Sequence, residues 1–322
     1  MKKYLVTGGS GFIGSALVKG LLEKGNYVRV FDNNSRGNLR RLNDVIENID
    51  FFKGDIRNIA DCEEACEGID SVCHLAFVNG TEYFYEKPEL VLEVGVKGMM
   101  NILDASLKKN IKELILASSS EVYQTPKLVP TDETTELIIP DPMNPRYSYG
   151  GGKLISELLT INYGRKYFNR TIIFRPHNVY GPDMGWEHVI PQFILRMNEL
   201  IKKDQDKISF PIQGSGGETR AFIYIEDFIS GLLKVIDNGE NLNIYHIGNE
   251  SEIAMKELAE SIGKIFDKNI EVIPGELTHG STLRRCPDIT KIKALGYKPK
   301  HTLNDGLLKT IEWYNNNLDL KI

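Results

Sequence analysis

A glycine-rich turn between two regular patterns constrains this chain more than any other feature of its sequence. Residues 4–25, YLVTGGSGFIGSALVKGLLEKG, join an apolar β-rich run to an amphipathic helical pattern. In such a strand–turn–helix unit the glycines allow the backbone to approach a pyrophosphate, which the helix N-terminus favours through its N–H groups and dipole. The alternative is a glycine-rich turn that binds no nucleotide. The phosphate-site candidates are Gly8, Gly11, Phe12, Ile13 and Gly14, within the pattern Gly9-x-Gly11-x-x-Gly14.

An acidic residue ends the next strand pattern and indicates which dinucleotide is bound. Asp32 closes the run YVRVFD at 27–32. A carboxylate at this place accepts hydrogen bonds from the adenosine ribose and repels a 2′-phosphate, so NAD is favoured over NADP. Arg36 in the following loop leaves NADP open, because a guanidinium can accommodate a 2′-phosphate.

Strand-like and helical patterns alternate through the first half of the chain. This order predicts an α/β fold with a Rossmann-type doubly wound parallel sheet, covered by helices on both faces. After residue 176 the order becomes irregular, which predicts a smaller C-terminal α/β substrate-binding region. We therefore expect an NAD-binding domain over 1–176 and a substrate region over 177–322, packed together without a linker and with the site between them. The strand patterns are 3–7, 27–32, 71–76, 113–118 and 171–176, and the helical patterns include 12–24, 88–109, 149–167 and 189–203.

Two Tyr-x-x-x-Lys patterns occur in the chain, and their surroundings differ. The first, Tyr83–Lys87, is followed by Pro88, which disfavours helical geometry at Lys87 and predicts a loop. The second, Tyr149–Lys153, opens a helical pattern, although its three intervening glycines each cost about 1 kcal/mol relative to Ala. The apolar face predicted to pack on the sheet is formed by Leu154, Leu158, Leu159 and Ile161.

The second pair has a chemical use on a helix. A tyrosine, with its pKa of about 10, is a poor base at neutral pH, but a Lys ammonium one turn away and the positive nicotinamide of NAD favour the phenolate. Tyr149 could then take a hydroxyl proton while NAD takes the hydride. The run LASSSEVY places hydroxyl groups at the carboxyl end of a strand, and Ser119 is the candidate to hold the substrate oxygen. The alternatives are an exposed Tyr–Lys pair and serines that only cap the strand.

Charge and cysteine usage exclude several classes of function. The 322 residues carry a formal net charge of −5, so no basic field would attract nucleic acid or an anionic membrane. No apolar stretch reaches the roughly 18 residues that would span a bilayer, and a cytoplasmic protein is expected. The four cysteines show neither C-x-x-C nor zinc spacing, so we expect reduced thiols and no metal site.

Six segments along nearly the whole chain resemble the extended short-chain dehydrogenase/reductase family of nucleotide-sugar epimerases, dehydratases and decarboxylases. They are TGGSGFIG, SSSEVY, YSYGGGK, RPHNVYGP, TRAFIYIED and RRCPDITK. The resemblance implies NAD as cofactor, a nucleotide-diphosphate sugar as substrate, and a homodimer formed through the helices at 88–109 and 149–167. The roles that it implies are Ser119, Tyr149 and Lys153 as catalytic residues, Asp32, Asn33, Asp55, Ile56, Leu75 and Ala76 beside the cofactor, and Asn178, Arg220 and Arg285 beside the nucleotide sugar.

Three positions depart from the pattern of that family. Gly152 stands where the residue before the catalytic lysine is often serine, and Gln124 stands where glycine is usual. Gly95 stands where asparagine is common. The last departure concerns the local support of the cofactor site.

The resemblance implies a shared first step, the oxidation of the sugar C4 hydroxyl to a ketone with hydride transfer to NAD. In the 4,6-dehydratases an Asp-Glu pair follows the catalytic Ser/Thr, whereas this chain has Ser120 and Glu121, so the acid for water loss is missing. Ser-Glu is similar to the decarboxylases of nucleotide-linked glucuronate, and Glu121 is a candidate base or hydrogen-bonding residue. Epimerisation needs no further acid or base, so a 4-epimerase is the first hypothesis.

Other outcomes stay open at this point. A net C4 dehydrogenase that produces a 4-keto sugar nucleotide and a UDP-glucuronate-type decarboxylase are the main alternatives, whereas a 4,6-dehydratase or a non-catalytic NAD-binding regulator fits the residues less well. The loop DMGWEHVIPQF is expected to border the sugar, with Trp186, Glu187 and His188 as candidates. The residues do not distinguish UDP, GDP, dTDP and CDP sugars.

Overall fold

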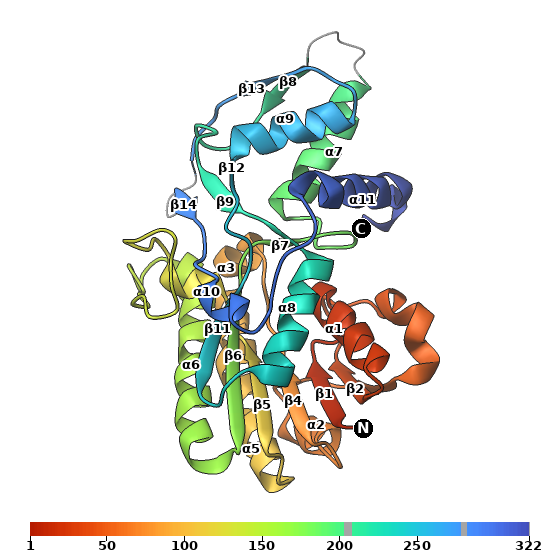
Figure 1. Cartoon of the computed structure of the whole chain (residues 1–322), viewed down its shortest axis with the longest axis vertical. Coiled ribbons are helices and arrows are strands. Elements are labelled where there is room, and N and C mark those ends of the chain that lie inside the picture. Colours follow the sequence, from red (N-terminus) through yellow and green to blue (C-terminus); the bar gives the residue numbers. More distant parts are fainter. Residues whose placement is uncertain (203–207, 278–281, 322) are drawn as a thin grey trace.

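A seven-stranded sheet forms the centre of the computed structural model, which describes residues 1–202, 208–277 and 282–321. Its strand order is β11-β6-β5-β4-β1-β2-β3, and every neighbouring pair runs parallel (Figure 1). This is the Rossmann-type sheet that the alternating patterns predict. The strands are β1 (Lys3–Thr7), β2 (Tyr27–Asp32), β3 (Asp50–Lys53), β4 (Ser71–His74), β5 (Glu113–Ala117), β6 (Arg170–Pro176) and β11 (Asn243–Ile247).

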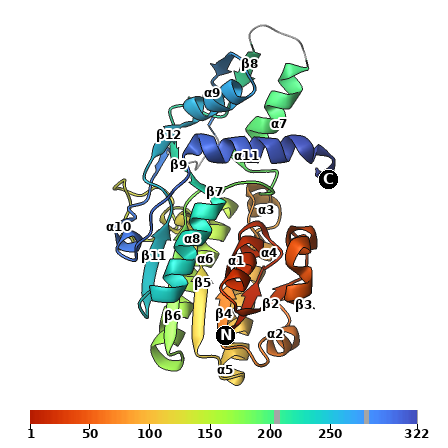
Figure 2. The same ribbon diagram turned by 45° about the vertical axis from the view of Figure 1, so that its right-hand side comes forward.

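Helices cover both faces of the sheet, and each face has its own hydrophobic core. In β1, Tyr4 and Val6 belong to one core and Leu5 belongs to the other, because successive side chains of a strand point to opposite faces. A strand buried on both faces needs a continuous apolar run, which is why these segments can be recognised in the sequence. One face carries α1 (Phe12–Glu23) and α8 (Ile225–Asn238), and the other carries α2 (Ile59–Ala65), α5 (Gly98–Lys108) and α6 (Ser148–Tyr167) (Figure 2).

The chain beyond residue 176 builds a second region at one end of the sheet and also returns to the sheet. Strand β11 pairs with β6, so the sheet takes its last strand from this later part of the chain. The second region lies at the top of Figure 1 and consists of short sheets and helices. Apart from α8 and β11, the elements after β6 are β7 (Val179–Tyr180), α7 (Val189–Ile201), β8 (Ile208–Pro211), β9 (Thr219–Ala221), β10 (Ile223–Tyr224), β12 (Glu252–Ala254), α9 (Met255–Ile265), β13 (Ile270–Ile273), β14 (Arg284–Arg285), α10 (Thr290–Lys293) and α11 (Leu303–Asn316).

The sequence predicts a loop for the first Tyr-x-x-x-Lys pattern, and this prediction is wrong for Tyr83. Tyr83 lies in the short helix α3 (Thr81–Glu86). Lys87 has non-helical backbone angles, with φ −141° and ψ 51°, and Pro88 begins the next helix, α4 (Pro88–Leu92), as expected for a residue before proline. The proline was therefore interpreted correctly, but a helix of six residues before it was missed.

Some boundaries also differ from the sequence patterns. The strands predicted at 71–76 and 113–118 end earlier, at His74 and Ala117. The helical pattern at 88–109 is interrupted, because a π-helical turn joins α4 to α5. This turn is Glu93–Lys97, and the 3₁₀ helices are Leu39–Asn48, Ser120–Tyr123, Pro145–Tyr147 and Leu318–Leu320.

The cysteines behave as the sequence predicts. Cys62, Cys66, Cys73 and Cys286 are buried and free of disulfide bonds. Burial raises the pKa of the Cys66 thiol to about 12, so this group is a neutral packing residue at physiological pH. Among the helices of the described residues, none has the length and apolar character needed to cross a membrane.

Candidate active site

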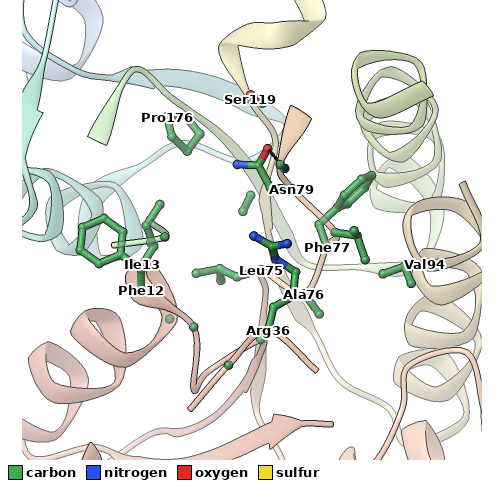
Figure 3. A pocket seen from close by; sticks show the side chains of 18 of the residues that line it. Phe12, Ile13, Arg36, Leu75, Ala76, Phe77, Asn79, Val94, Ser119 and Pro176 are labelled. Carbon is green, nitrogen blue, oxygen red and sulfur yellow. Dashed lines mark hydrogen bonds between the residues drawn. The ribbon is translucent and has the colours of Figure 1, made fainter. Parts of the chain in front are cut away.

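The candidate site is a cavity of about 480 Å³ at the carboxyl ends of the central strands. It lies where the strand order reverses, with β2 on one side of β1 and β4 on the other, which is where open α/β sheets bind ligands. Figure 3 shows side chains that line it. Arg220, a predicted site residue, does not line it, because its guanidinium donates to the backbone oxygens of Thr219 (2.7 Å) and Thr282 (2.6 Å). The predicted residues that line the cavity are Gly8, Gly11, Phe12, Ile13, Gly14, Asp32, Asn33, Asp55, Ile56, Leu75, Ala76, Ser119, Glu121, Tyr149, Lys153, Asn178 and Arg285.

The glycine turn leaves no room for side chains. Gly8 has a φ of +70°, and its N–H donates to the backbone oxygen of Phe31 (2.9 Å). A Cβ at Gly14 would lie 2.1 Å from the oxygen of Gly8, so α1 can approach the turn this closely only with glycine. No side chain caps α1, and its first N–H groups have no partner within the helix. This cradle fits the pyrophosphate of a dinucleotide.

At the end of β2 an acid is held in place, and the nearby arginine is engaged elsewhere. Asp32 accepts hydrogen bonds from the backbone N–H groups of Ser10 (3.1 Å) and Asn34 (2.9 Å). Arg36 forms an ion pair with Glu187, which lies in the loop after β7. The guanidinium that could have accommodated the 2′-phosphate of NADP is therefore already paired with Glu187, which agrees with the preference for NAD predicted from Asp32.

The predicted adenine-side residues form a connected group. The amide nitrogen of Asn33 donates to Asp55 (3.0 Å), and Asp55 also pairs with Arg57 (2.7 Å). The hydrogen bond from Arg57 lowers the pKa of Asp55 to about 2, so this carboxylate stays ionised at neutral pH. Ile56 is buried and packs closely on Gly98, where a Cβ would lie 2.4 Å from its Cδ1.

The candidate hydroxyl, phenol and amine meet at the wall formed by β5 and α6. Ser119 follows β5 and caps the 3₁₀ turn after it, where its hydroxyl oxygen accepts a hydrogen bond from the backbone N–H of Glu121 (3.2 Å), and it lies close enough to Tyr149 to lower the pKa of that phenol. Tyr149 and Lys153 lie one turn apart on α6, with only 7% and 3% of their surfaces exposed. The amine of Lys153 donates to the backbone oxygen of Ala117 (2.7 Å). The structure therefore brings together the three residues that the sequence singled out.

Burial governs the ionisation of both helix residues. It raises the pKa of Tyr149 to about 12, although the Ser119 hydroxyl group acts in the opposite direction. It lowers the pKa of Lys153 to about 7, although the charge of Glu157 raises it. The expected stabilisation of the phenolate by the lysine is thus outweighed here, because each group is in surroundings that favour its neutral form.

Only part of the apolar face predicted for helix α6 packs on the protein: Leu159 and Ile161 are partly buried against the second hydrophobic core. Leu158, which was predicted to be packed, is 53% exposed. On the buried face, Glu157 accepts two hydrogen bonds from the guanidinium of Arg175 (2.8 and 2.6 Å), and both side chains are buried. The most deeply buried face of α6 is therefore formed by site residues and this ion pair, and the predicted apolar residues pack beside it only in part. The buried residues of α6 are Tyr149, Gly150, Gly151, Gly152, Lys153, Ser156, Glu157, Thr160 and Gly164.

The first two glycines of YSYGGGK differ in their surroundings. A Cβ at Gly150 would lie 2.4 Å from the Nε2 atom of Gln124 and 2.9 Å from the backbone oxygen of Glu121. A Cβ at Gly151 would contact only the end of the Ile139 side chain, at 3.2 Å. Glycine at 150 is therefore required by the close approach of the loop after β5, whereas glycine at 151 has no comparable reason.

Gly150→Ala is expected to lower the free energy of unfolding by about 1–3 kcal/mol, because overpacking against a backbone oxygen exceeds the gain in helix propensity. Gly151→Ala is the matched control and is expected to be neutral or to stabilise by up to about 1 kcal/mol, since Ile139 is 44% exposed and can move. Urea unfolding of the two variants measures the difference. Equal losses at both positions would contradict this explanation of the glycines.

A cluster of arginines surrounds Glu121. Its carboxylate pairs with Arg285 at 2.5 Å. Burial raises the pKa of Glu121, but Arg285, Arg146 and Arg220 outweigh burial and hold the pKa below its usual range. At neutral pH Glu121 is therefore an ionised hydrogen-bond acceptor that is already engaged, and not a free acid or base.

Several lining residues were not singled out in the sequence, and Arg146 and Phe77 are two that lie beside the proposed catalytic residues. Arg146 lies three residues before Tyr149, just ahead of α6, and Phe77 directly follows Ala76 after β4. Both positions adjoin segments that were singled out, at places where parallel sheets and their helices meet ligands. Proximity in sequence to those segments is the signal that could have identified them.

Only two of the three residues predicted to border the sugar in the loop after β7 line the cavity. Glu187 and His188 line the cavity. Trp186 instead packs against Tyr314, with ring centres 4.7 Å apart, and so supports the loop from behind. Asn178, which begins this part of the chain, lines the cavity and donates to the backbone oxygen of Ala221 (3.1 Å).

Residues 4–248 match the family described as the NAD dependent epimerase/dehydratase family. The chain belongs to this family. It is 32% identical to the UDP-N-acetyl-α-D-glucosaminuronate decarboxylase of Bacillus cytotoxicus, over 97% of this chain and 98% of that protein. It is 31% identical to UDP-glucuronic acid decarboxylase 5 of Arabidopsis thaliana, over 95% and 87% of the two chains.

Solved structures of other nucleotide-sugar enzymes are similar over the full length. The UDP-glucose 4-epimerase of Thermotoga maritima with UDP-glucose has a TM-score of 0.86 and 28% identity, with 98% of this chain and 99% of that chain covered. The dTDP-glucose 4,6-dehydratase of Streptomyces venezuelae, solved with NAD, has a TM-score of 0.87 and 27% identity, with 99% and 98% covered. This member of the NAD dependent epimerase/dehydratase family is an NAD-dependent enzyme of the short-chain dehydrogenase/reductase type that modifies nucleotide sugars.

Proposed function

We propose that this enzyme oxidises the C4 hydroxyl of the sugar in a nucleotide-diphosphate sugar, with Ser119, Tyr149 and Lys153 as its catalytic residues. One observation carries the proposal: these three side chains line the same cavity as the glycine turn. A sugar hydroxyl between Ser119 and Tyr149 would have a hydrogen-bonding group and a proton acceptor within reach. The names of the relatives, which are 4-epimerases, decarboxylases and 4,6-dehydratases, support the assignment.

Each residue has its own task in this proposal. Ser119 holds the C4 oxygen, Tyr149 takes its proton as the ketone forms, and Lys153 favours the phenolate by its charge. When bound, NAD accepts the hydride that leaves C4, and its positive nicotinamide favours the Tyr149 phenolate. Because burial lowers the pKa of Lys153 to about 7, its charge changes within the physiological pH range.

The nucleotide-sugar end of the cavity is rich in arginine. Arg285 and Asn178 line it, and guanidinium groups suit the oxygens of a diphosphate. Arg220 lies opposite Arg285 in the paired strands β9 and β14. Burial and the charge of Arg285 lower the pKa of Arg220 to about 10. In this arrangement Arg285 contacts the substrate and Arg220 supports it from behind.

For the overall outcome we propose 4-epimerisation. Elimination of water needs a free acid and a free base, but Glu121 is bound to Arg285 and the residue before it is Ser120. Epimerisation needs only that the 4-keto sugar present its other face to the reduced cofactor. The cavity already holds each group that this outcome requires.

Decarboxylation is the second candidate, and the positive charge around Glu121 favours it. Arg146 and Arg285 line the cavity together, and one carboxylate cannot neutralise both. A sugar with a carboxylate on C5 becomes a β-keto acid once C4 is oxidised. The C5–C6 bond then breaks, carbon dioxide leaves, the electron pair moves toward the C4 carbonyl, and C5 takes up a proton. The two decarboxylase relatives support this alternative.

Product mass distinguishes these outcomes. The purified protein is incubated with NAD and, separately, with neutral and uronate sugars of UDP, GDP, dTDP and CDP, and NADH absorbance is followed while the products are separated and weighed. We expect a product of unchanged mass from a neutral sugar, without lasting NADH. Loss of carbon dioxide from a uronate would instead establish decarboxylation, and loss of two hydrogens with stable NADH would establish a net dehydrogenase. No reaction with any of these sugars would contradict the proposed function.

A further inference from the structure

Phe77 fills a space that two glycines leave open beside the proposed catalytic pair. It follows β4 and lies beside Val94 in the cavity (Figure 3). A Cβ at Gly95 would lie 2.3 Å from the Cζ atom of Phe77, and a Cβ at Gly152 would lie 3.1 Å from the same atom. A side chain at position 95 and the ring in this place therefore exclude each other.

The same ring contacts both members of the pair. The amine of Lys153 lies 4.0 Å from the centre of the Phe77 ring, which is within the range of a cation–π interaction. The ring of Tyr149 meets Phe77 edge-on, with centres 5.1 Å apart and planes at 81°. Since the amine also donates to the oxygen of Ala117 (2.7 Å), it is held between a carbonyl group and an aromatic face.

Two of the three departures from the family pattern meet at this ring. Gly95 replaces the common asparagine and Gly152 the frequent serine, and a Cβ at either position would meet the same atom of Phe77. We propose that Phe77 is a positioning residue whose ring holds the Lys153 ammonium and the Tyr149 phenol in the geometry for proton transfer. The proposal rests on the proposed function of those two residues and adds a third that acts through them.

Among the described residues, few ionisable groups act on the Lys153 amine, so the effect of the Phe77 ring on the pKa of Lys153 can be measured. Burial lowers the pKa of Lys153 to about 7, and the charge of Glu157 on the next turn of α6 raises it. From β4, His74 is neutral, because burial and Lys153 lower its pKa to about 3. Tyr149 is neutral as well, and β5 presents only the oxygen of Ala117. Because an aromatic face stabilises a cation, its loss should make Lys153 release its proton at lower pH.

Phe77→Leu tests the aromatic face separately from the bulk of the side chain. Leucine keeps an apolar group that excludes water, so we expect the pKa of Lys153 to fall by about half a unit to one unit. The measurement is an NMR titration of protein labelled with ¹³Cε-lysine, in which Lys153→Met identifies the resonance. An unchanged or raised pKa of Lys153 in Phe77→Leu would overturn the proposal.

Gly95→Ala is a second route to the same test, with Gly98→Ala as its matched control. A Cβ at Gly95 must displace Phe77, whereas the nearest neighbours of a Cβ at Gly98 all belong to Ile56, with Cδ1 at 2.4 Å. We expect both variants to lose thermal stability, but only Gly95→Ala to lower the pKa of Lys153. An equal fall of the Lys153 pKa in both variants would show that the shift comes from a general loss of packing, and it would reject the role of Phe77.

A turnover measurement completes the test. The NMR titration needs no substrate, so it examines Phe77 even if every nucleotide sugar proves inactive. With an active sugar, we expect the rise of kcat/KM with pH to begin at a higher pH in Phe77→Leu, because a less charged Lys153 favours the Tyr149 phenolate less. Turnover at pH 7 should fall about threefold to tenfold. A wild-type pH profile in Phe77→Leu would overturn the positioning role while leaving the proposed C4 oxidation intact.

Discussion

Tyr149→Phe is expected to lower turnover by two or more orders of magnitude while NAD binding persists. The variant keeps the aromatic ring, which packs on Phe77 and stacks on Phe84 with ring centres 5.0 Å apart, and loses only the phenolic oxygen. Loss of general acid–base catalysis typically costs factors of about 100 to 10,000. Steady-state kinetics with the active sugar and fluorescence titration with NADH measure the two quantities separately.

The other Tyr-x-x-x-Lys pattern offers a matched control for this experiment. Tyr83 lies on α3, outside the residues that line the cavity, and its ring supports Arg36 at 4.7 Å. Tyr83→Phe removes the same hydroxyl group from the same sequence pattern and should retain turnover. Near-normal turnover in Tyr149→Phe would remove Tyr149 from the mechanism, and an equal loss in both variants would show that the assay responds to general perturbation.

The strands of the sheet could be predicted where a short stretch of sequence itself shows the apolar pattern of a buried strand. Five apolar runs are long enough to form strands that are buried between two layers of helices. The turn after β1 is recognisable as well, because its close backbone contacts require glycine. Strand β3 is only four residues long, DFFK, and has charged residues at both ends. Strand β11, NIYHI, contains a histidine in its buried part. Strand β11 pairs with β6, which lies far earlier in the chain, whereas β3 pairs with the nearby β2 but is too short and too polar at its ends to show a strand pattern. Local periodicity therefore does not reveal either strand.

Contacts between distant segments also explain what the sequence could not show about the site. Ser119, Tyr149 and Lys153 could be singled out as candidates because of their residue types and spacing, and the structure places all three in one cavity. The ion pair of Arg36 with Glu187 joins residues 151 positions apart, so the sequence alone could not show that Arg36 is engaged. Likewise, the direction in which burial shifts a pKa depends on every segment packed around the group.

Gln124 stands where glycine is usual, and its side-chain contacts show how a larger residue is tolerated there. Gln124 has a φ of +53°, which explains why glycine is usual at this position. Such a conformation costs a non-glycine residue about 1–3 kcal/mol. The side-chain nitrogen of Gln124 donates to the backbone oxygen of Glu121 (2.6 Å), and this same nitrogen is what Gly150 must accommodate. A glutamine at 124 and a glycine at 150 are therefore one structural feature, although the sequence presents them as two irregularities.

Lys153→Met is expected to abolish turnover and, below pH 7, to make the protein more stable. Burial lowers the pKa of Lys153 from 10.5 to about 7. Below pH 7 the amine is protonated in both states, and the folded protein carries a buried charge that costs several kcal/mol, at about 1.4 kcal/mol per pKa unit. Methionine removes this cost but leaves the oxygen of Ala117 without its donor, which offsets about 1–2 kcal/mol. The net gain in the free energy of unfolding should be about 3 kcal/mol.

The stability difference between Lys153→Met and the wild-type protein should depend on pH, and this dependence is the test. Between about pH 7 and pH 10 only the unfolded chain binds the proton, so the wild-type protein becomes more stable as the pH rises. The advantage of Lys153→Met should therefore shrink by about 1.4 kcal/mol per pH unit above pH 7, vanish near about pH 9, and give way to a more stable wild-type protein above that pH. Urea unfolding at pH 6 and pH 9 measures the two values, and Lys97→Met at the exposed Lys97 should change neither. If the wild-type protein is the more stable one at both pH values, Lys153 does not carry a buried charge, and the enzyme does not sacrifice stability to keep an ionisable amine beside Tyr149.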